Sequence, residues 1–254
     1  MTDFIIDVEH IQEKIWQIGA ELVDCRACNE PAANRLTMLD KGPPARCLWF
    51  EAVDHADSGV IVLGLNPGRA SAEELNDYVG KAGRELYEAT VKYLMNASRD
   101  INFYTRLREF IRSAFDDKPL HVLWTEIAKC EILRGEKAVP VRMQRACAWK
   151  FLVREVKEVP PTWPIIAAGD EAYRAAAFLF PERKVIGVPH PSGGRPNRFH
   201  ELFDPHADWD STPRRLKLNG DVEETLRRTL QVERGCEKVR FSARKKMPWS
   251  STEQ

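Results

Sequence analysis

The sequence predicts an α/β fold, a three-layer α/β/α sandwich around a central, mostly parallel sheet of about four strands. Short apolar runs recur along the chain, and most of them are separated by segments with helical periodicity. Strands that alternate with helices in this way form parallel sheets covered on both faces. The chain has 254 residues, of which 43% are hydrophobic, enough for a sizeable core. We therefore expect one domain over residues 1–254, with a flexible basic tail at residues 233–254.

The first expected element is an amphipathic helix over residues 7–23, where Ile11, Ile15 and Ile18 fall at helical spacing. Residues 200–219, rich in Asp, Pro and Arg, are typical of a long insertion. The remaining strands and helices follow in alternation. Strands are expected at residues 48–50, 60–63, 120–124, 165–168 and 185–188, and helices at residues 82–96, 103–115, 141–158, 170–179 and 221–232.

The charge balance gives no sign of a nucleic-acid partner at the level of the whole chain. Thirty-eight basic residues match 38 acidic residues, so only a local basic patch, such as residues 238–249, could attract DNA. No apolar run approaches the roughly 18 residues that span a bilayer. The N-terminus carries acids where a signal peptide is basic and then apolar. We therefore expect a cytoplasmic monomer without a membrane partner.

Two turn motifs follow predicted strands. The sequence GLNPG spans residues 64–68, and PHPSGGRPNRF spans residues 189–199. Ligands of open parallel sheets bind at the carboxyl ends of the strands, so both motifs are expected to face one crevice. GLNPG is not a phosphate loop, because no Gly-Lys-Ser/Thr follows at the required spacing. Taken alone, GLNPG is equally well explained as a structural turn, and HPSGG alone is weaker evidence for a functional site.

Four of the six cysteines have a spacing that is typical of a metal site. Cys25 and Cys28 form a Cys-x-x-Cys pair, and Cys130 and Cys147 follow with 16 residues between them. In a cytoplasmic chain of this size, metal binding or packing is favoured over a disulfide framework. Four thiolates can hold zinc or an iron-sulfur cluster, and the ligand type does not separate the two.

The order of these motifs resembles the uracil-DNA glycosylase superfamily, especially its iron-sulfur branch, over roughly residues 24–195. The motifs that carry the resemblance are Cys-x-x-Cys, the GxxPG turn, DYVGKAG, TEIAKC, a further cysteine about one helix later, IIAAGDEA and PHPS. The resemblance implies a DNA glycosylase that flips out a damaged or modified pyrimidine and hydrolyses its N-glycosidic bond. It also implies a structural 4Fe-4S cluster on Cys25, Cys28, Cys130 and Cys147, with zinc as the alternative metal. Cys47 and Cys236 match no ligand and are expected to be a core residue and a tail thiol.

The resemblance also assigns roles to individual residues. Asn66 matches the amide that orients the attacking water; a neutral amide is no strong base, so its contribution is positioning. His190 matches the motif histidine and is the candidate donor to the leaving base. The base pocket implied by the resemblance consists of Gly64, Leu65, Tyr78 and Glu126, with Tyr78 stacking on the flipped base. The implied DNA contacts are Ser192, Gly193, Gly194 and Arg195, with Arg195 as the wedge.

Two departures from the family pattern bear on the substrate. Leu65-Asn66 stands where the iron-sulfur branch has Glu-Ala, as in branches that excise mismatched or modified pyrimidines. Glu126 stands where an asparagine normally reads uracil, and an ionised carboxylate only accepts hydrogen bonds. A buried carboxylate that faces the uracil carbonyl places two acceptors together without a proton, which costs about 1 to 3 kcal/mol. A glutamate that accepts a hydrogen bond from the exocyclic amine of cytosine is a recognised pairing.

These departures lead to the hypothesis of a modified cytosine as substrate, for example in phage DNA as part of a defence system. If Glu126 is instead protonated, turned away or bound to an arginine, plain uracil returns as the substrate. Two further interpretations stay open: a non-catalytic or covalent DNA-binding member, and a metal-binding α/β protein unrelated to DNA.

Overall fold

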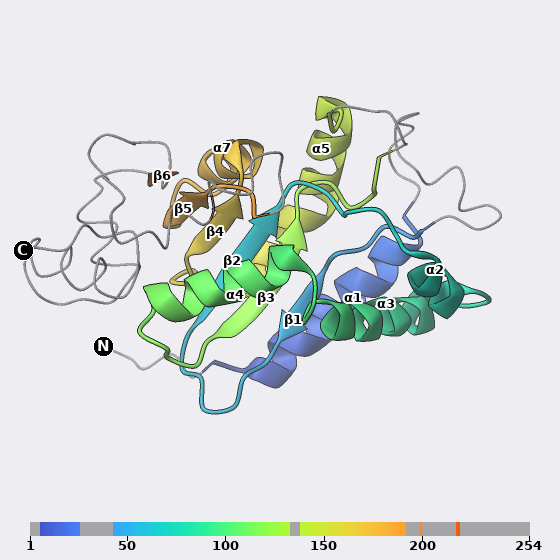
Figure 1. Ribbon diagram of the computed structural model, residues 1–254, viewed down its shortest axis with the longest axis horizontal. Helices are drawn as coiled ribbons and strands as arrows, with labels where there is room; N and C mark the ends of the chain where they lie inside the picture. Colours follow the sequence, from blue (N-terminus) through green and yellow to red (C-terminus); the bar gives the residue numbers. More distant parts are fainter. Residues whose placement is uncertain (1–5, 26–42, 133–137, 192–198, 200–216, 219–254) are drawn as a thin grey trace, which may run out of the picture. The chain divides into compact units, whose positions relative to one another are not determined.

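The computed structural model describes residues 6–25, 43–132, 138–191, 199 and 217–218 (Figure 1). The contacts divide the chain into two compact units. Unit 1 comprises Met1–Ala97 and Leu120–Trp163, and unit 2 comprises Ser98–Pro119 and Pro164–Gln254. The expectation of a single domain stays a prediction.

Unit 1 contains three strands side by side, β1 (Trp49–Glu51), β3 (His121–Glu126) and β2 (Gly59–Gly64), in that order (Figure 1). β2 and β3 are parallel, and their register pairs Gly64 with Glu126 at the carboxyl ends. β1 runs antiparallel to β3. All residues of β2 and β3 are buried, as expected for parallel strands covered on both faces.

The helices of unit 1 bury apolar stripes against these strands and one another. α1 (Val8–Val23) begins at Asp7, whose side chain accepts a hydrogen bond from the backbone of His10, and it packs against β1, α3 and α6. α2 (Ala72–Tyr78) and α3 (Gly83–Ala97) follow the turn after β2. α5 (Val141–Cys147), the π-helical segment η2 (Ala148–Leu152) and α6 (Val153–Lys157) are consecutive.

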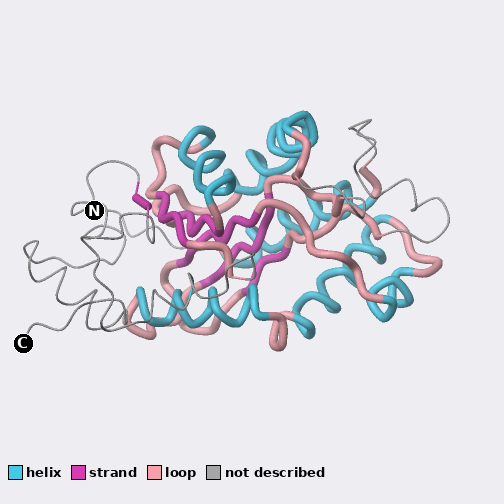
Figure 2. Tube along the Cα trace, turned by 45° about the horizontal axis from the view of Figure 1, so that its top comes forward, coloured by secondary structure: helices cyan, strands magenta, loops and turns pink. Residues whose placement is uncertain are grey.

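Unit 2 contains a second set of three strands. β4 (Ile165–Ala168) and β5 (Val185–Val188) are parallel, and β6 (Lys217–Leu218) pairs antiparallel with β5. α7 (Asp170–Leu179) packs against β4 and β5, and α4 (Asn102–Ala114) belongs to the same unit. Figure 2 shows the alternation of strands and helices along the chain in magenta and cyan.

The predicted fold class is confirmed: the chain is a mixed α/β protein whose inner strands are parallel. The described residues form six strands, three in each unit, against an expected total of about four. Five of the six correspond to the segments expected as strands, and only β6, which pairs antiparallel with β5, was not expected. Every expected strand and helix that falls within the described residues is present; the expected helix at residues 221–232 does not fall within them. That segment, the tail at residues 233–254 and most of residues 200–219 lie outside the described residues.

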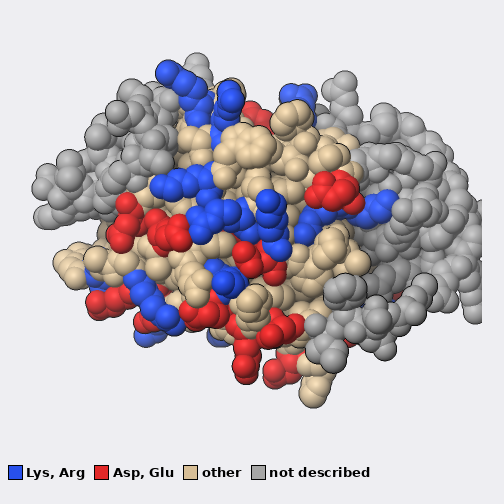
Figure 3. Space-filling model, turned by 180° about the vertical axis from the view of Figure 1, so that it is seen from behind, with Lys and Arg blue, Asp and Glu red and all other residues tan. Residues whose placement is uncertain are grey.

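Two whole-chain properties follow from the described residues. On the face drawn in Figure 3, Lys and Arg side chains are intermixed with Asp and Glu side chains, in keeping with the zero net charge. None of the helices in the described part of the chain is both long and apolar enough to cross a bilayer.

Candidate active site

The turn after β2 is held to the end of β3 by a continuation of the parallel ladder. The backbone N–H of Ile127 donates to the carbonyl of Gly64 at 3.0 Å, and that of Ala128 donates to the carbonyl of Leu65 at 2.9 Å. The first two residues of GLNPG therefore have fixed positions beside Glu126, the last residue of β3.

Asn66, the candidate water-positioning residue, is half-buried in this turn. Its side-chain Nδ2 donates to the carbonyl of Pro67 at 3.0 Å, a bond within the turn itself. The side chain is thus oriented by its own loop, and the place of the amide depends on how that loop is anchored.

Glu126 is buried with an unsatisfied oxygen. The residue is 6% exposed, and Oε2 has no hydrogen-bond partner among the described residues. A Cβ placed on Gly64 would lie 3.3 Å from the Glu126 carboxyl group, so this glycine leaves the room that the carboxyl occupies. Since buried polar atoms are nearly always paired in native proteins, this oxygen is available to a polar partner.

The charge state of Glu126 follows from its surroundings. Burial raises the pKa of Glu126 from 4.5 to about 8, although the nearby charges of Lys129 and Arg46 lower it. Both cations already face other carboxylates, Lys129 that of Glu155 and Arg46 those of Glu74 and Glu131. At pH 7 the carboxyl is therefore mostly neutral, with one O–H to donate and one carbonyl oxygen to accept.

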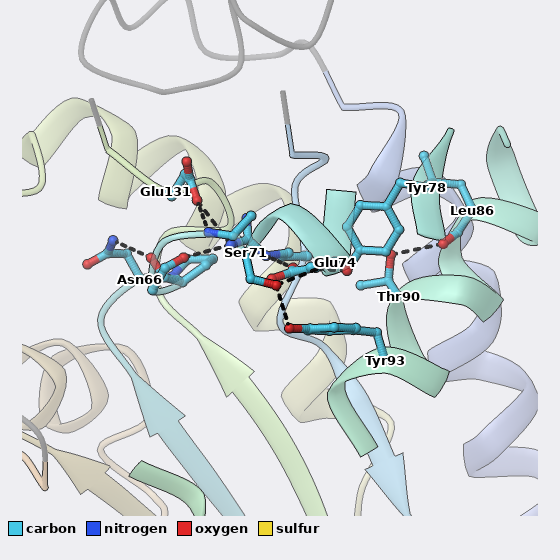
Figure 4. A network of polar contacts seen from close by, with 12 residues as sticks. Asn66, Ser71, Glu74, Tyr78, Leu86, Thr90, Tyr93 and Glu131 are labelled. Carbon is cyan, nitrogen blue, oxygen red and sulfur yellow. Dashed lines mark hydrogen bonds and ion pairs between the residues drawn. The ribbon is translucent and has the colours of Figure 1, made fainter. Parts of the chain in front are cut away.

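Arg46 is buried, with 2% of the residue exposed, and its side chain holds the turn after β2 in place. Its Nη2 donates to the carbonyl of Gly68 at 2.6 Å and to Glu131 Oε2 at 3.0 Å, and its Nε pairs with Glu74 Oε1 at 2.7 Å. Glu131 Oε2 also accepts from the backbone N–H of Ala70 at 2.8 Å (Figure 4). These contacts connect the loop that carries Asn66 with α2 and with the segment after β3.

Tyr78, the candidate stacking residue, ends α2 and is 7% exposed. Its hydroxyl donates to Glu74 Oε1 at 2.9 Å, and burial raises the pKa of this hydroxyl (Figure 4). Ser71 caps the start of α2 by accepting from the backbone N–H of Glu74. Tyr78 is therefore fixed by the same carboxylate that pairs with Arg46, and stacking on a base stays a prediction.

His190, the candidate donor, lies in unit 2 at the end of β5. Its ring centroid is 5.3 Å from that of Phe103 on α4, and burial lowers the pKa of His190, so the ring is neutral at pH 7. A Cβ on Gly169, whose φ is +96°, would lie 3.6 Å from His190 Cβ. Arg106 of α4 donates to the carbonyl of Pro191, so α4 supports both residues of the motif.

Three of the four candidate metal ligands are described. Cys130 and Cys147 are buried and Cys25 is half-buried; Cys28 lies outside the described residues. Lys150, three residues after Cys147, donates towards Cys25 Sγ at 3.7 Å, which brings the end of α1 beside η2. Among the residues that the structure describes, no three His, Cys, Asp or Glu side chains are grouped so as to hold a metal ion.

A scan against protein-family models matches the uracil DNA glycosylase superfamily at residues 50–207, more than half of the chain. The chain belongs to the uracil-DNA glycosylase superfamily. Membership supports DNA glycosylase as the general class of activity, and it makes DNA a plausible partner. A search of curated proteins found no match.

The superfamily match covers most of the candidate residues. Gly64, Leu65, Asn66, Tyr78 and Glu126 fall within it in unit 1, and His190 falls within it in unit 2. Their meeting in one crevice stays a prediction, because the two motifs belong to different units. The predicted DNA contacts Ser192, Gly193, Gly194 and Arg195 fall within the matched range but lie outside the described residues, so their role stays a prediction.

Arg46, Glu74 and Glu131 could not be identified as site residues from the sequence. They form the buried ion-pair cluster that holds the segment after the GLNPG turn. Arg46 precedes the matched region, and no motif surrounds it. Glu131 directly follows Cys130 and Glu74 lies on a short helix, so neither stands out from a solvated surface charge in the sequence. Only the fold brings them together.

Proposed function

We propose that this protein is a DNA glycosylase that flips out a modified or deaminated pyrimidine and hydrolyses its N-glycosidic bond, leaving an abasic site. The observation that carries the proposal is the buried, unsatisfied carboxyl oxygen of Glu126, next to the turn that holds Asn66. A polar edge of a pyrimidine would satisfy that oxygen, and excision requires the base to leave the duplex stack.

The proposed mechanism divides the work between two neutral groups. Asn66 holds the attacking water against the sugar carbon through its amide, and its contribution is orientation rather than proton abstraction. Bond cleavage leaves a cationic sugar and an anionic base. His190, neutral because burial lowers its pKa, donates a hydrogen bond to the base and lowers the barrier, by roughly 3 kcal/mol on the scale of an oxyanion-hole donor.

The identity of the base depends on the proton of Glu126. The hypothesis of a modified cytosine, with a defence role against phage DNA, rests on an ionised carboxylate that accepts from the exocyclic amine. The raised pKa of Glu126 supports the neutral form near pH 7. A neutral carboxyl donates to O4 and accepts from N3–H of uracil, and it equally donates to N3 and accepts from the amine of cytosine. The neutral form therefore makes uracil a candidate substrate beside the modified cytosines.

A panel of labelled duplexes separates these substrates. The purified protein is incubated with uracil, cytosine, hydroxymethylcytosine, its glucosylated form or hydroxymethyluracil in the duplex, and alkali then cleaves any abasic site. We expect cleavage at a modified cytosine, and cleavage at uracil that declines as the pH rises through about 8, where Glu126 ionises. Glu126→Gln, which carries no titratable proton, should remove that decline. Cleavage at uracil alone would contradict the modified-cytosine hypothesis.

The metal centre is a separate proposal. We propose that Cys25, Cys28, Cys130 and Cys147 hold a structural 4Fe-4S cluster, with zinc as the alternative. The contact between Lys150 and Cys25 supports it, because it draws one half of the Cys-x-x-Cys pair towards the helix of Cys147. Elemental analysis of protein purified without oxygen should find iron and sulfide, or zinc, lost in Cys130→Ser. Metal-free protein with an intact fold would contradict the proposal.

The non-catalytic alternative has its own signature. If the chain is a DNA-binding member without turnover, no duplex in the panel will acquire an abasic site although DNA is bound. A covalent member would instead leave a protein–DNA adduct that survives denaturation. The presence of both Asn66 and His190 favours turnover.

A further inference from the structure

We propose that Arg46 is a positioning residue that sets the place of Asn66, and that it does so by clamping the loop at Gly68 and at Ala70. The inference rests on the proposed function, since Asn66 acts on a water only in a glycosylase. It extends that function to a residue that precedes the part of the chain matched by the superfamily.

Among the described residues, the Asn66 side chain forms few hydrogen bonds that could hold it in place. The only bond that its amide makes to the described residues joins it to the adjacent Pro67. Behind it, the ladder to β3 ends at Leu65, whose carbonyl accepts from Ala128. The residues that follow Asn66 along the chain must therefore hold the loop in place.

Two contacts that follow Asn66 along the chain, at Gly68 and at Ala70, lead to one guanidinium, that of Arg46. The carbonyl of Gly68 accepts from Arg46 Nη2 at 2.6 Å. The backbone N–H of Ala70 donates to Glu131 Oε2, and that same oxygen is 3.0 Å from Arg46 Nη2. Both ends of a three-residue stretch, beginning two residues after Asn66, are thus tied to Arg46, directly or through one carboxylate.

Arg46 also contacts elements that carry residues of the predicted base pocket. Arg46 Nε pairs with Glu74 at 2.7 Å, and Glu74 accepts the hydroxyl of Tyr78 (Figure 4). The backbone N–H of Arg46 also donates to the carbonyl of Lys129, between Glu126 and Cys130. One residue therefore connects the loop of Asn66, the helix of Tyr78 and the strand end of Glu126.

The burial of this cluster favours positioning over stability as its role. Arg46, Glu74 and Glu131 have side chains that are 2%, 6% and 5% exposed. Removing charges from water offsets most of their attraction, so a buried ion pair adds little net stability compared with an apolar core. Its directional bonds do impose one geometry, and a planar fork of five N–H donors is suited to holding several acceptors at once.

The test uses Arg46→Lys, which keeps the charge but loses the fork. The matched control is Arg84→Lys in the same unit, since Arg84 also lies between two carboxylates, Glu88 and Glu13, but on the surface. With the duplex that the wild type excises, we expect Arg46→Lys to lower kcat about 10- to 100-fold, with KM within about threefold, because small misplacements of a positioned group cost this much. Arg84→Lys should stay within about twofold of the wild type.

A double-variant comparison separates positioning from a general effect. In an Asn66→Ala background, Arg46→Lys should lower the residual rate by a clearly smaller factor than it lowers the wild-type rate, because the part of its effect that acts through Asn66 is already gone. An equal loss of rate in both backgrounds, or a full rate in Arg46→Lys alone, would overturn the inference.

Hydrogen exchange tests the clamp without relying on activity. Arg46→Lys should speed amide exchange at Ala70 while the strands β2 and β3 stay protected, and Glu131→Gln, which retains an acceptor for Ala70, should have the smaller effect. Unchanged exchange at Ala70 would overturn the clamp. A wild type that excises no base, combined with faster exchange at Ala70, would contradict the proposed function while supporting the clamp itself.

Discussion

At the scale of single residues, the base that the pocket can bind depends on whether the Glu126 carboxyl carries a proton. A carboxyl at the buried end of a parallel strand is costly as an anion, and the neighbouring cations are already paired with Glu155, Glu74 and Glu131. The neutral form is therefore favoured up to about pH 8, and it offers a base both a donor and an acceptor. The sequence alone identifies the carboxylate but not its charge state, which depends on burial.

Replacing Glu126 should change how stability depends on pH. The pKa of Glu126 is raised in the folded protein, so its contribution to stability is full below about pH 4.5 and is lost as the pH rises to about 8. Relative to the wild type, Glu126→Gln should gain up to roughly 1.4 kcal/mol in free energy of unfolding per pH unit across this window. Urea unfolding at several pH values measures this, and a constant difference would show that Glu126 titrates normally.

An added methyl group at Gly64 should shift the Glu126 carboxyl. A Cβ at residue 64 would lie 3.3 Å from that carboxyl group, a contact tight enough to move it slightly, so Gly64→Ala should lower kcat/KM about tenfold with little loss of stability. Wild-type kcat/KM in Gly64→Ala would contradict the placement of Glu126.

At the scale of elements, α4 supports His190. Phe103 packs beside the imidazole and Arg106 holds the carbonyl of Pro191, so the helix orients the motif from one side. Gly169 approaches from another side, at a φ that favours glycine.

Variants of two arginines on α4 test this support. Arg106→Ala should lower the excision rate about tenfold by loosening the His190 motif. Arg108→Ala removes a comparable pair of bonds, to the backbone and side chain of Ser98, and should leave the rate within about twofold. Single-turnover rates on saturating DNA measure both. If both variants retain the wild-type rate, α4 does not position His190.

The regular elements could be predicted from the sequence because their signal is local. Apolar runs and helical spacing identified the five longer strands and α1, α3, α4 and α7. α2 was missed because a seven-residue helix with the sequence AEELNDY has no apolar stripe. The π-helical segment η2 inside the expected helix 141–158 depends on a shift in hydrogen bonding that periodicity does not reveal.

The candidate site could be predicted only where motifs mark it. Asn66, Glu126 and His190 lie in or beside recognisable turns at strand ends. Arg46 does not, because its partners Gly68 and Glu131 are 22 and 85 residues away along the chain. Long-range ion pairs of this kind emerge from the tertiary fold.

At the scale of the whole molecule, the proposed DNA binding falls to a chain without net charge. Basic and acidic side chains are intermixed on the face drawn in Figure 3. Because the net charge is zero, we expect phosphate contacts to be few and local. Such an interface would still respond to salt.

DNA affinity should therefore fall as salt rises, but along a shallow slope. Each phosphate contact makes the decline of log affinity with log salt steeper by about 0.9, so we expect the shallow decline that a few contacts produce. Fluorescence anisotropy with a labelled duplex at several salt concentrations measures it. An affinity independent of salt would contradict direct phosphate contacts.

The central claim is that Asn66 serves base excision, and one comparison tests it most directly. Wild-type protein and Asn66→Ala are incubated under single-turnover conditions with duplexes containing a modified cytosine or uracil, and abasic sites are counted after alkali cleavage. We predict abasic sites with the wild type and a rate at least about 100-fold lower with Asn66→Ala, at unchanged DNA affinity. Equal rates for the two proteins, or no abasic site with either one despite DNA binding, would contradict the account.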